Sequence, residues 1–247
     1  MTRNIHDDSN IFLSHKNPQV LLQTVNSELS NIIIWIHANK LSLNFQKTNY
    51  MLFSNWKIHV NKICKLLSRN TGVICKLKRV IPKEILFILY STLILPYLNY
   101  GILAWGNSSK SQNEKLCFIQ KRVIRIICNV HFRTHTNALF HQHEILKVED
   151  IYFMQLGSLM YDLNAGEFPL ALAQRFKKNS DIHRYNTRQA SDLHLPRART
   201  QFTLKTLVHT GPRFWNSLDA SIKHTSSKSA FKRRLKSHLL NTYCVDS

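Results

Sequence analysis

The chain has 247 residues, and its 34 Lys and Arg against 14 Asp and Glu give a formal net charge of +20. Hydrophobic residues make up 44% of the sequence, which is enough to build a core and excludes disorder throughout. A charge of this size needs a polyanionic partner or surface, and nucleic acid is the first candidate.

The cysteines and the N-terminus bear on the compartment. Five cysteines are scattered without a CxxC pair, so a disulfide framework or a zinc ribbon has little support and a reducing compartment is expected. The chain reaches Asp7 and Asp8 before any apolar stretch, which argues against an ordinary signal peptide. We therefore expect an intracellular protein, in the nucleus or the cytoplasm.

The first fifty residues alternate in type. Residues 10–14 form a short apolar run suited to a strand, and Asn17 followed by Pro18 predicts the start of a helix. This helix should bury one face and end at Asn39 and Lys40; its apolar positions are Leu22, Val25, Leu29, Ile32 and Ile36. Residues 41–53 alternate and are rich in aromatics, which predicts a second strand region. The local unit is strand, helix, strand.

After residue 54 the pattern becomes helical and basic. Residues 56–77 keep heptad-like apolar spacing and predict one amphipathic helix, interrupted at Gly72. Between Asn55 and Pro82 there is no acidic residue, and the cations there are Lys57, Lys62, Lys65, Arg69, Lys76, Lys78 and Arg79. A solvated helix usually mixes charges of both signs, so these cations are candidate contacts to an anion.

The segment from Ile85 to Ser109 carries no charge and is long enough to span a bilayer. Pro96, Asn99 and Gly101 interrupt it near its middle. The sequence therefore favours a buried core hairpin, whose first helix starts at Pro82, over a membrane span.

Helices are also predicted further along the chain. Residues 113–128 place their apolar side chains on one face, while the opposite side gathers Lys115, Lys121, Arg122 and Arg125. The next predicted helices cover residues 144–164, 168–176 and 227–240, with a long basic loop before the last.

Two metal sites are conceivable from the residues alone. Asp7 and Asp8 in a tight turn between strands could hold Mg²⁺, although a solvated turn explains them as well. A C-x2-H-x3-H spacing followed by two more histidines could supply half of a zinc site, although thirteen histidines cluster easily by chance; the residues are Cys128, His131, His135, His141 and His143.

Several sequence motifs occur in the same order as in a known protein family. Residues 4–53 contain the Asp7-Asp8 pair and an N-x-x-K-T motif with Lys47; residues 83–107 and 119–127, and the later RYNTRQASDLHLPRART and GPRFWNSLDASIK, continue the pattern. With these motifs the chain resembles the C-terminal part of a reverse transcriptase, an RNA-directed DNA polymerase, from a non-LTR retrotransposon of the jockey-like, LINE-type group.

The resemblance implies an α+β fold: a small palm remnant of strand, helix and strand at 1–54, thumb-like basic helices at 55–130, and a helical tail region at 131–247. In this family Asp7 would be a metal ligand, Asp8 its companion, and Lys47 would assist the departing pyrophosphate. Mg²⁺ would bind only if the polymerase site is completed. The cations already named would contact RNA, DNA or an RNA–DNA hybrid.

The sequence also departs from the family. Ile5 and His6 stand where an aromatic and a small residue are usual, and Ser54 leads directly to Trp56, where a primer-gripping hairpin is usual. Six residues precede Asp7, fewer than the fingers and the first palm aspartate need. We expect a truncated reverse transcriptase that does not polymerise alone but binds nucleic acid without sequence preference. Two alternatives stay open: a poorly folded pseudogene product, and an active polymerase whose true chain extends upstream of Met1.

Overall fold

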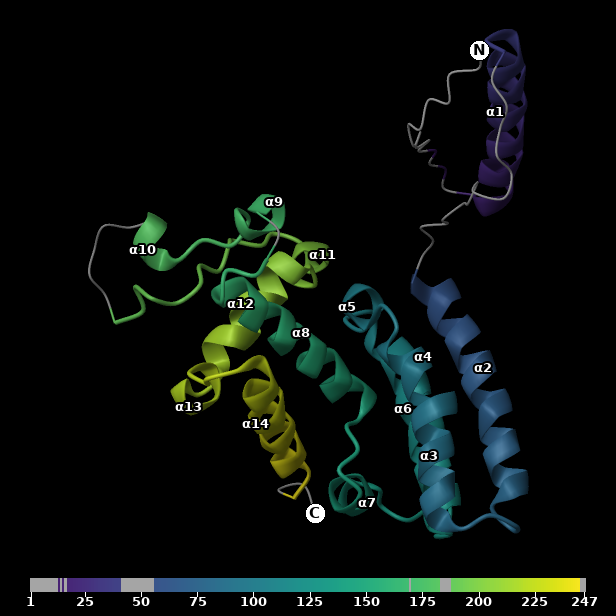
Figure 1. The fold of residues 1–247 in the computed structure, drawn as a ribbon, viewed down its shortest axis with the longest axis vertical. Coiled ribbons are helices and arrows are strands. Elements are labelled where there is room, and N and C mark those ends of the chain that lie inside the picture. The colour runs from purple at the N-terminus through teal and green to yellow at the C-terminus, as the bar shows by residue number, and fades with distance from the viewer. Residues whose placement is uncertain are drawn as a thin grey trace. The chain divides into compact units, whose positions relative to one another are not determined.

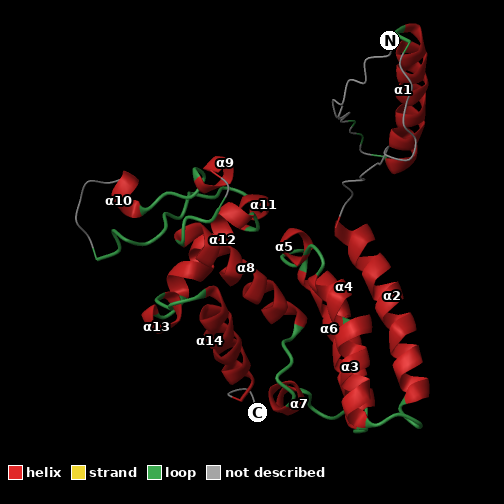
Figure 2. Ribbon diagram, viewed as in Figure 1, coloured by secondary structure: helices red, strands yellow, loops and turns green. Residues whose placement is uncertain are grey.

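The computed structural model describes residues 13, 15, 17–40, 56–168, 170–182 and 188–244. This part of the chain is mostly helical, and its only β pairing is a single antiparallel bridge between Lys178 and Leu193 (Figure 2). The predominance of helix was predicted for the region after residue 54 and is confirmed. The two predicted strands, at 10–14 and 41–53, fall outside the described residues except for Leu13. By its contacts the chain divides into two compact units, Met1–Phe53 and Ser54–Ser247.

The first unit contains helix α1, Pro18–Ala38. The Asn17 side chain accepts a hydrogen bond from the Gln19 backbone N–H at 2.9 Å, so the predicted start is confirmed. On the predicted apolar face, Val25, Leu29, Ile32 and Ile36 are half-buried rather than buried. Leu22 is 63% exposed, while the adjacent Leu21 is partly buried.

The second unit holds the remaining helices, whose order Figure 1 shows. They are α2 (Trp56–Leu77), α3 (Lys83–Leu93), α4 (Leu95–Asn99), α5 (Ile102–Trp105), α6 (Lys110–Cys128), α7 (Asn137–Gln142), α8 (Val148–Asn164), α9 (Leu170–Ala173), α10 (Asn179–Ile182), α11 (Gln201–Leu204), α12 (Leu207–Ser217), α13 (Ala220–Lys223), α14 (Lys228–Asn241) and the 3-10 turn η1 (Thr242–Cys244).

Helix α2 runs without a break through Gly72, so the predicted interruption is wrong. Buried side chains lie on both sides of the glycine, with Leu67 before it and Ile74 after it. Because this apolar face packs continuously on α6 and α3, tertiary contacts hold the helix where the local propensity is weak.

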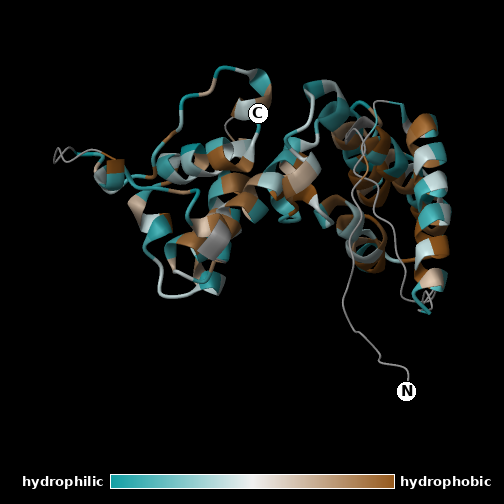
Figure 3. Ribbon diagram, turned by 90° about the horizontal axis from the view of Figure 1, so that it is seen from above, coloured by the Kyte–Doolittle hydropathy of each residue, from teal (hydrophilic) through white to brown (hydrophobic). Residues whose placement is uncertain are grey.

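The uncharged segment folds into the core as three short helices, α3, α4 and α5, so its predicted burial in the core is confirmed. Leu86, Tyr90, Ile94, Leu98 and Trp105 are all buried. Along the described ranges, no helix combines the length and the apolar character that crossing a bilayer requires. Figure 3 shows hydrophobic and hydrophilic residues alternating along the helices, as expected for amphipathic elements.

Helices α2 and α6 pack side by side and run parallel. Near their C-terminal ends the Lys78 ammonium donates to the Asn129 side chain at 3.4 Å. Nearer their N-terminal ends the Lys115 ammonium lies close enough to the Cys64 thiol to act on its pKa. Both pairs have the same sequence offset, so one parallel register explains them. Helix α6 begins at Lys110, one turn before the predicted residue 113.

Gln120 joins three parts of the core. Its side chain is 1% exposed; Nε2 donates to the Tyr90 hydroxyl and to the Leu146 carbonyl at 2.9 Å each, and Oε1 accepts from the Val148 N–H at 3.0 Å. Burial raises the pKa of Tyr90 to about 12, so the hydroxyl stays protonated. Gln120 thereby fixes α6 against α3 and against the start of α8.

The C-terminal helices pack on α8. Helix α8 starts at Val148 rather than at the predicted residue 144, because Glu144 adopts a positive φ of 49° and breaks the helical path. Helix α14 starts after the Ser227 cap as predicted, and its Phe231 and Leu235 are buried. The Tyr243 hydroxyl donates to Asp150 on α8, which ties the C-terminal turn to the same helix.

We expect Gly72→Ala to stabilise the protein by about 1 kcal/mol, because alanine favours a helix interior and restricts the unfolded chain. A Cβ at Gly72 would meet no atom within 4 Å. The measurement is urea unfolding followed by circular dichroism. The control is Gly106→Ala, whose Cβ would lie 2.7 Å from the Ile102 carbonyl oxygen and should destabilise. A loss of stability in Gly72→Ala would contradict the continuous helix.

We expect Gln120→Leu to lower the free energy of unfolding by about 3 kcal/mol, because three buried polar groups lose their partner. Tyr90→Phe removes only one of these hydrogen bonds and should cost about 1 kcal/mol. Urea unfolding measures both variants. Equal losses in the two variants would show that Gln120 does not act through the Leu146 and Val148 backbone.

Candidate nucleic-acid interface

The residues predicted for catalysis and metal binding, Asp7, Asp8 and Lys47, lie outside the described residues. Their role therefore stays a prediction. Within the ranges that the structure describes, no three or more His, Cys, Asp and Glu side chains gather closely enough to hold a metal ion.

The conceivable zinc ligands are not brought together by the fold. The His131 ring packs beside Phe132 with 4.4 Å between the centroids, and the His143 ring packs beside Phe87, also at 4.4 Å. Burial lowers the pKa of His143, and the Lys83 ammonium lowers it further. Cys128 is the last residue of α6. His131, His135 and His141 are exposed, and His143 is half-buried against Phe87.

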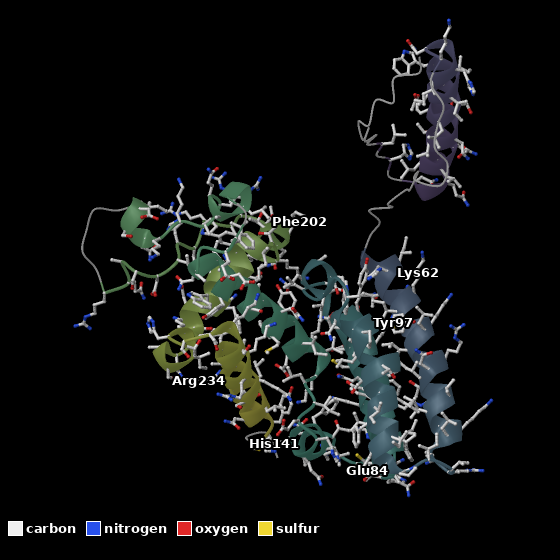
Figure 4. The ribbon with its side chains drawn as sticks, in the orientation of Figure 1. Lys62, Glu84, Tyr97, His141, Phe202 and Arg234 are labelled. Atoms are coloured by element: carbon white, nitrogen blue, oxygen red, sulfur yellow. The ribbon has the colours of Figure 1, made fainter. Side chains whose placement is uncertain are left out.

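Four of the predicted cations form a single row on α2. At 100° per residue, Lys62, Lys65, Arg69 and Lys76 fall within about 60° of the helix circumference and span about 21 Å of its length. All four are exposed, and the buried stripe that includes Val60 and Leu67 lies on the opposite side of the helix. We call these four residues the α2 row. Figure 4 shows Lys62 near the start of α2 and several nitrogen-tipped side chains projecting outward from this helix.

The α2 row has no carboxylate partner in the described part of the chain. Helix α2 contains no acidic residue, and none of the four cations takes part in an ion pair there. Exposed cations without counter-charges create a positive potential that attracts anions.

Helix α14 carries as many cations but uses several of them within the fold. Lys228 pairs with Asp162 at 2.6 Å, and Lys236 pairs with Glu144 at 3.3 Å. Arg234, labelled in Figure 4, donates to the Ser221 carbonyl. These cations of α14 therefore help to hold the fold together, whereas the cations of the α2 row remain available to a ligand.

Some of the other predicted cations are exposed, and others are engaged within the fold. Arg122 on α6 is exposed, and Lys121 is half-buried. Arg125 Nε donates to the Thr134 carbonyl at 2.9 Å, so this residue fastens the loop after α6. Lys78 and Arg79 follow the end of α2, and the side chain of Lys57 lies outside what the structure describes.

The contact between α2 and α6 brings cations of both helices together. Burial raises the pKa of the Cys64 thiol, and the nearby Lys115 ammonium lowers it in part. Lys65 of the α2 row follows Cys64 directly. The exposed Lys115 therefore adds a cation on α6 beside this level of α2.

Three further residues of these helices and of the segments that join them were missed by the sequence analysis. Phe118 on α6 is 65% exposed and lies one turn from Arg122, where an aromatic ring can stack on an unpaired base. Lys83 and Asn129 line a pocket together with Lys78 and Arg79. No spacing in the sequence could have indicated the pocket, because its lining comes from distant segments.

Comparison with known protein families, with curated proteins and with solved structures found no match. What the geometry offers is a row of solvated cations on a rigid helix, with further cations on its neighbour. Such a surface can neutralise phosphates, and phosphate contacts give affinity without reading sequence.

Proposed function

We propose that the helices from α2 to α6 bind RNA, DNA or an RNA–DNA hybrid without sequence preference. The observation that carries this proposal is the α2 row: four exposed cations, opposite the buried face and without a carboxylate partner in the described part of the chain. The partner must be a polyanion, because a single small anion would occupy only part of a row about 21 Å long.

Nucleic acid suits this surface better than a membrane does. The α2 row lies on a helix whose apolar stripe is already buried in the core. Among the side chains of α2 that the structure describes, Ile58 and Val73 are the only exposed large apolar ones, at 40% and 43%, and two isolated side chains do not make the continuous apolar face that a lipid interface needs. A nucleic-acid backbone presents phosphates at regular intervals and needs only positive charge in return. Flexible lysines on a helix surface can follow such a backbone without contacting base edges.

We further propose that the whole chain is a truncated reverse transcriptase of a non-LTR retrotransposon, in which these helices act as a thumb-like part. Support comes from the motifs of residues 4–53 and from the order of the later segments. The proposal includes a strand–helix–strand palm remnant at 1–54, with Asp7 and Asp8 as ligands of Mg²⁺ and Lys47 beside the departing pyrophosphate. On this proposal the chain binds nucleic acid but does not extend a primer by itself.

Polymerisation is the second candidate, and the Asp7-Asp8 pair with the N-x-x-K-T motif favours it. A primer-extension assay on an RNA template with Mg²⁺ separates the two functions. Nucleotide addition by the wild type that is abolished in Asp7→Ala would establish the polymerase. Retention of nucleic acid equally by both proteins, without addition, would support the binding function.

The binding proposal is tested by removing charge from the α2 row. In the variant Lys62→Gln/Lys65→Gln/Arg69→Gln, glutamine keeps the helix propensity while the charges are lost. We expect its affinity for an RNA–DNA hybrid to fall by about tenfold, the sum of three exposed charge contacts of about 0.5 kcal/mol each. Fluorescence anisotropy with a labelled hybrid measures the dissociation constant.

The control removes three exposed cations far from the row, in the variant Lys177→Gln/Lys232→Gln/Arg233→Gln. It has the same net charge as the first variant, and Lys232 and Arg233 lie on α14, which packs on α8. Thermal melts of both variants should remain cooperative, as expected of a folded domain. Equal weakening in the two variants would mean that total charge, rather than the α2 row, attracts the nucleic acid.

A further inference from the structure

The end of α2, the start of α3 and the end of α6 meet around a pocket of about 500 Å³. Its polar lining is Lys78, Arg79, Lys83 and Asn129. The rest of the lining is formed by Cys128 and by the apolar side chains Ile81, Leu86, Ile126 and Ile127. No acidic side chain lines this pocket, although it has three cations.

The three cations lack counter-charges from the described residues. None of them takes part in an ion pair there, and Lys78 is held toward the end of α6 by its hydrogen bond to the Asn129 side chain. Glu84 follows Lys83 in the chain but does not line the pocket. Three positive charges around one cavity repel one another, and an anion between them removes that repulsion.

The remaining groups also favour an anion. Burial raises the pKa of the Cys128 thiol more than the Lys83 ammonium lowers it, so the thiol is neutral at physiological pH.

The pocket is continuous with the α2 row. Arg79, an exposed residue of the pocket lining, follows Lys76, the last residue of the row, by three residues or about one helical turn, so a backbone that follows the row reaches the pocket at Arg79. Lys78 instead faces α6. Arg79 can offer two parallel N–H donors to a phosphate, and Lys78 and Lys83 can add point charges. The volume also leaves room for the sugar attached to that phosphate.

We infer that this pocket receives a backbone phosphate of the bound nucleic acid, held by Lys78, Arg79 and Lys83. The inference rests on the proposed binding function and adds a defined binding site for one phosphate. A nucleic-acid backbone can slide along cations on a convex helix surface, whereas a pocket holds one of its phosphates in place. The pocket therefore sets the register of the nucleic acid relative to α2.

The test compares the full chain with the variant Arg79→Gln/Lys83→Gln. Binding of an RNA–DNA hybrid should weaken by about tenfold, because two charge-assisted contacts to one phosphate are lost. The control is Lys177→Gln/Lys232→Gln, which loses the same charge at exposed positions outside the pocket and should change the affinity by less than about twofold. In the wild type, the backbone amide NMR signals of Lys83 and Asn129 should shift as the hybrid is added.

Two results would overturn the inference while leaving the proposed function intact. One is a wild type that binds the hybrid without any shift at Lys83 and Asn129. The other is a pocket variant that binds as tightly as its control while the α2-row variant binds weakly. Absence of binding by the wild type would reject the proposed function itself, so the two failures are distinguishable.

Discussion

The arrangement of α2 depends on one constraint, the separation of apolar and cationic residues along a helix without acids. Val60, Leu67 and Ile74 must be buried, and their 3.6-residue periodicity fixes which side of the helix faces the core. The cations therefore lie on the opposite side of the helix. Because no acid occurs within α2, this side cannot neutralise itself as a mixed surface would.

A buried polar centre keeps this surface in a fixed position relative to the rest of the unit. Gln120 links α6 to Tyr90 on α3 and to the backbone before α8, and Asn70 on α2 donates to the Leu93 carbonyl at 2.7 Å. Hydrogen bonds specify a unique arrangement where apolar contacts alone allow sliding. The α2 row and the pocket near Lys83 therefore belong to one rigid group of helices.

Local signals in the sequence predicted much of this fold. The caps at Asn17 and Ser227 start α1 and α14, since capping depends only on neighbouring residues. Gly101 likewise marks where the uncharged segment turns, with a positive φ of 61°, whereas Pro96 lies in the first turn of α4. The continuity of α2 at Gly72 could not be predicted, because packing on both sides outweighs a local preference. The role of Gln120 was also hidden, since a single glutamine in an amphipathic helix looks like a surface residue.

The candidate site was also predictable only in part, because the sequence shows local patterns but not tertiary contacts. The absence of acids between Asn55 and Pro82 indicated the cations of the α2 row as candidates, but the sequence could not show that Arg125 is engaged with Thr134 while Arg122 is exposed. The pocket combines Lys83 and Asn129 from distant segments, and a juxtaposition of this kind depends on tertiary structure. Residues 1–12 and 41–55 lie outside the described residues, so the palm remnant rests on sequence motifs.

The salt dependence of binding tests the central claim most directly. If the four cations of the α2 row each neutralise one phosphate of a duplex, a plot of the logarithm of the association constant against the logarithm of the salt concentration should be linear with a slope of about −3 to −4. The same slope should appear for unrelated sequences. An association constant that does not change with salt would contradict the account.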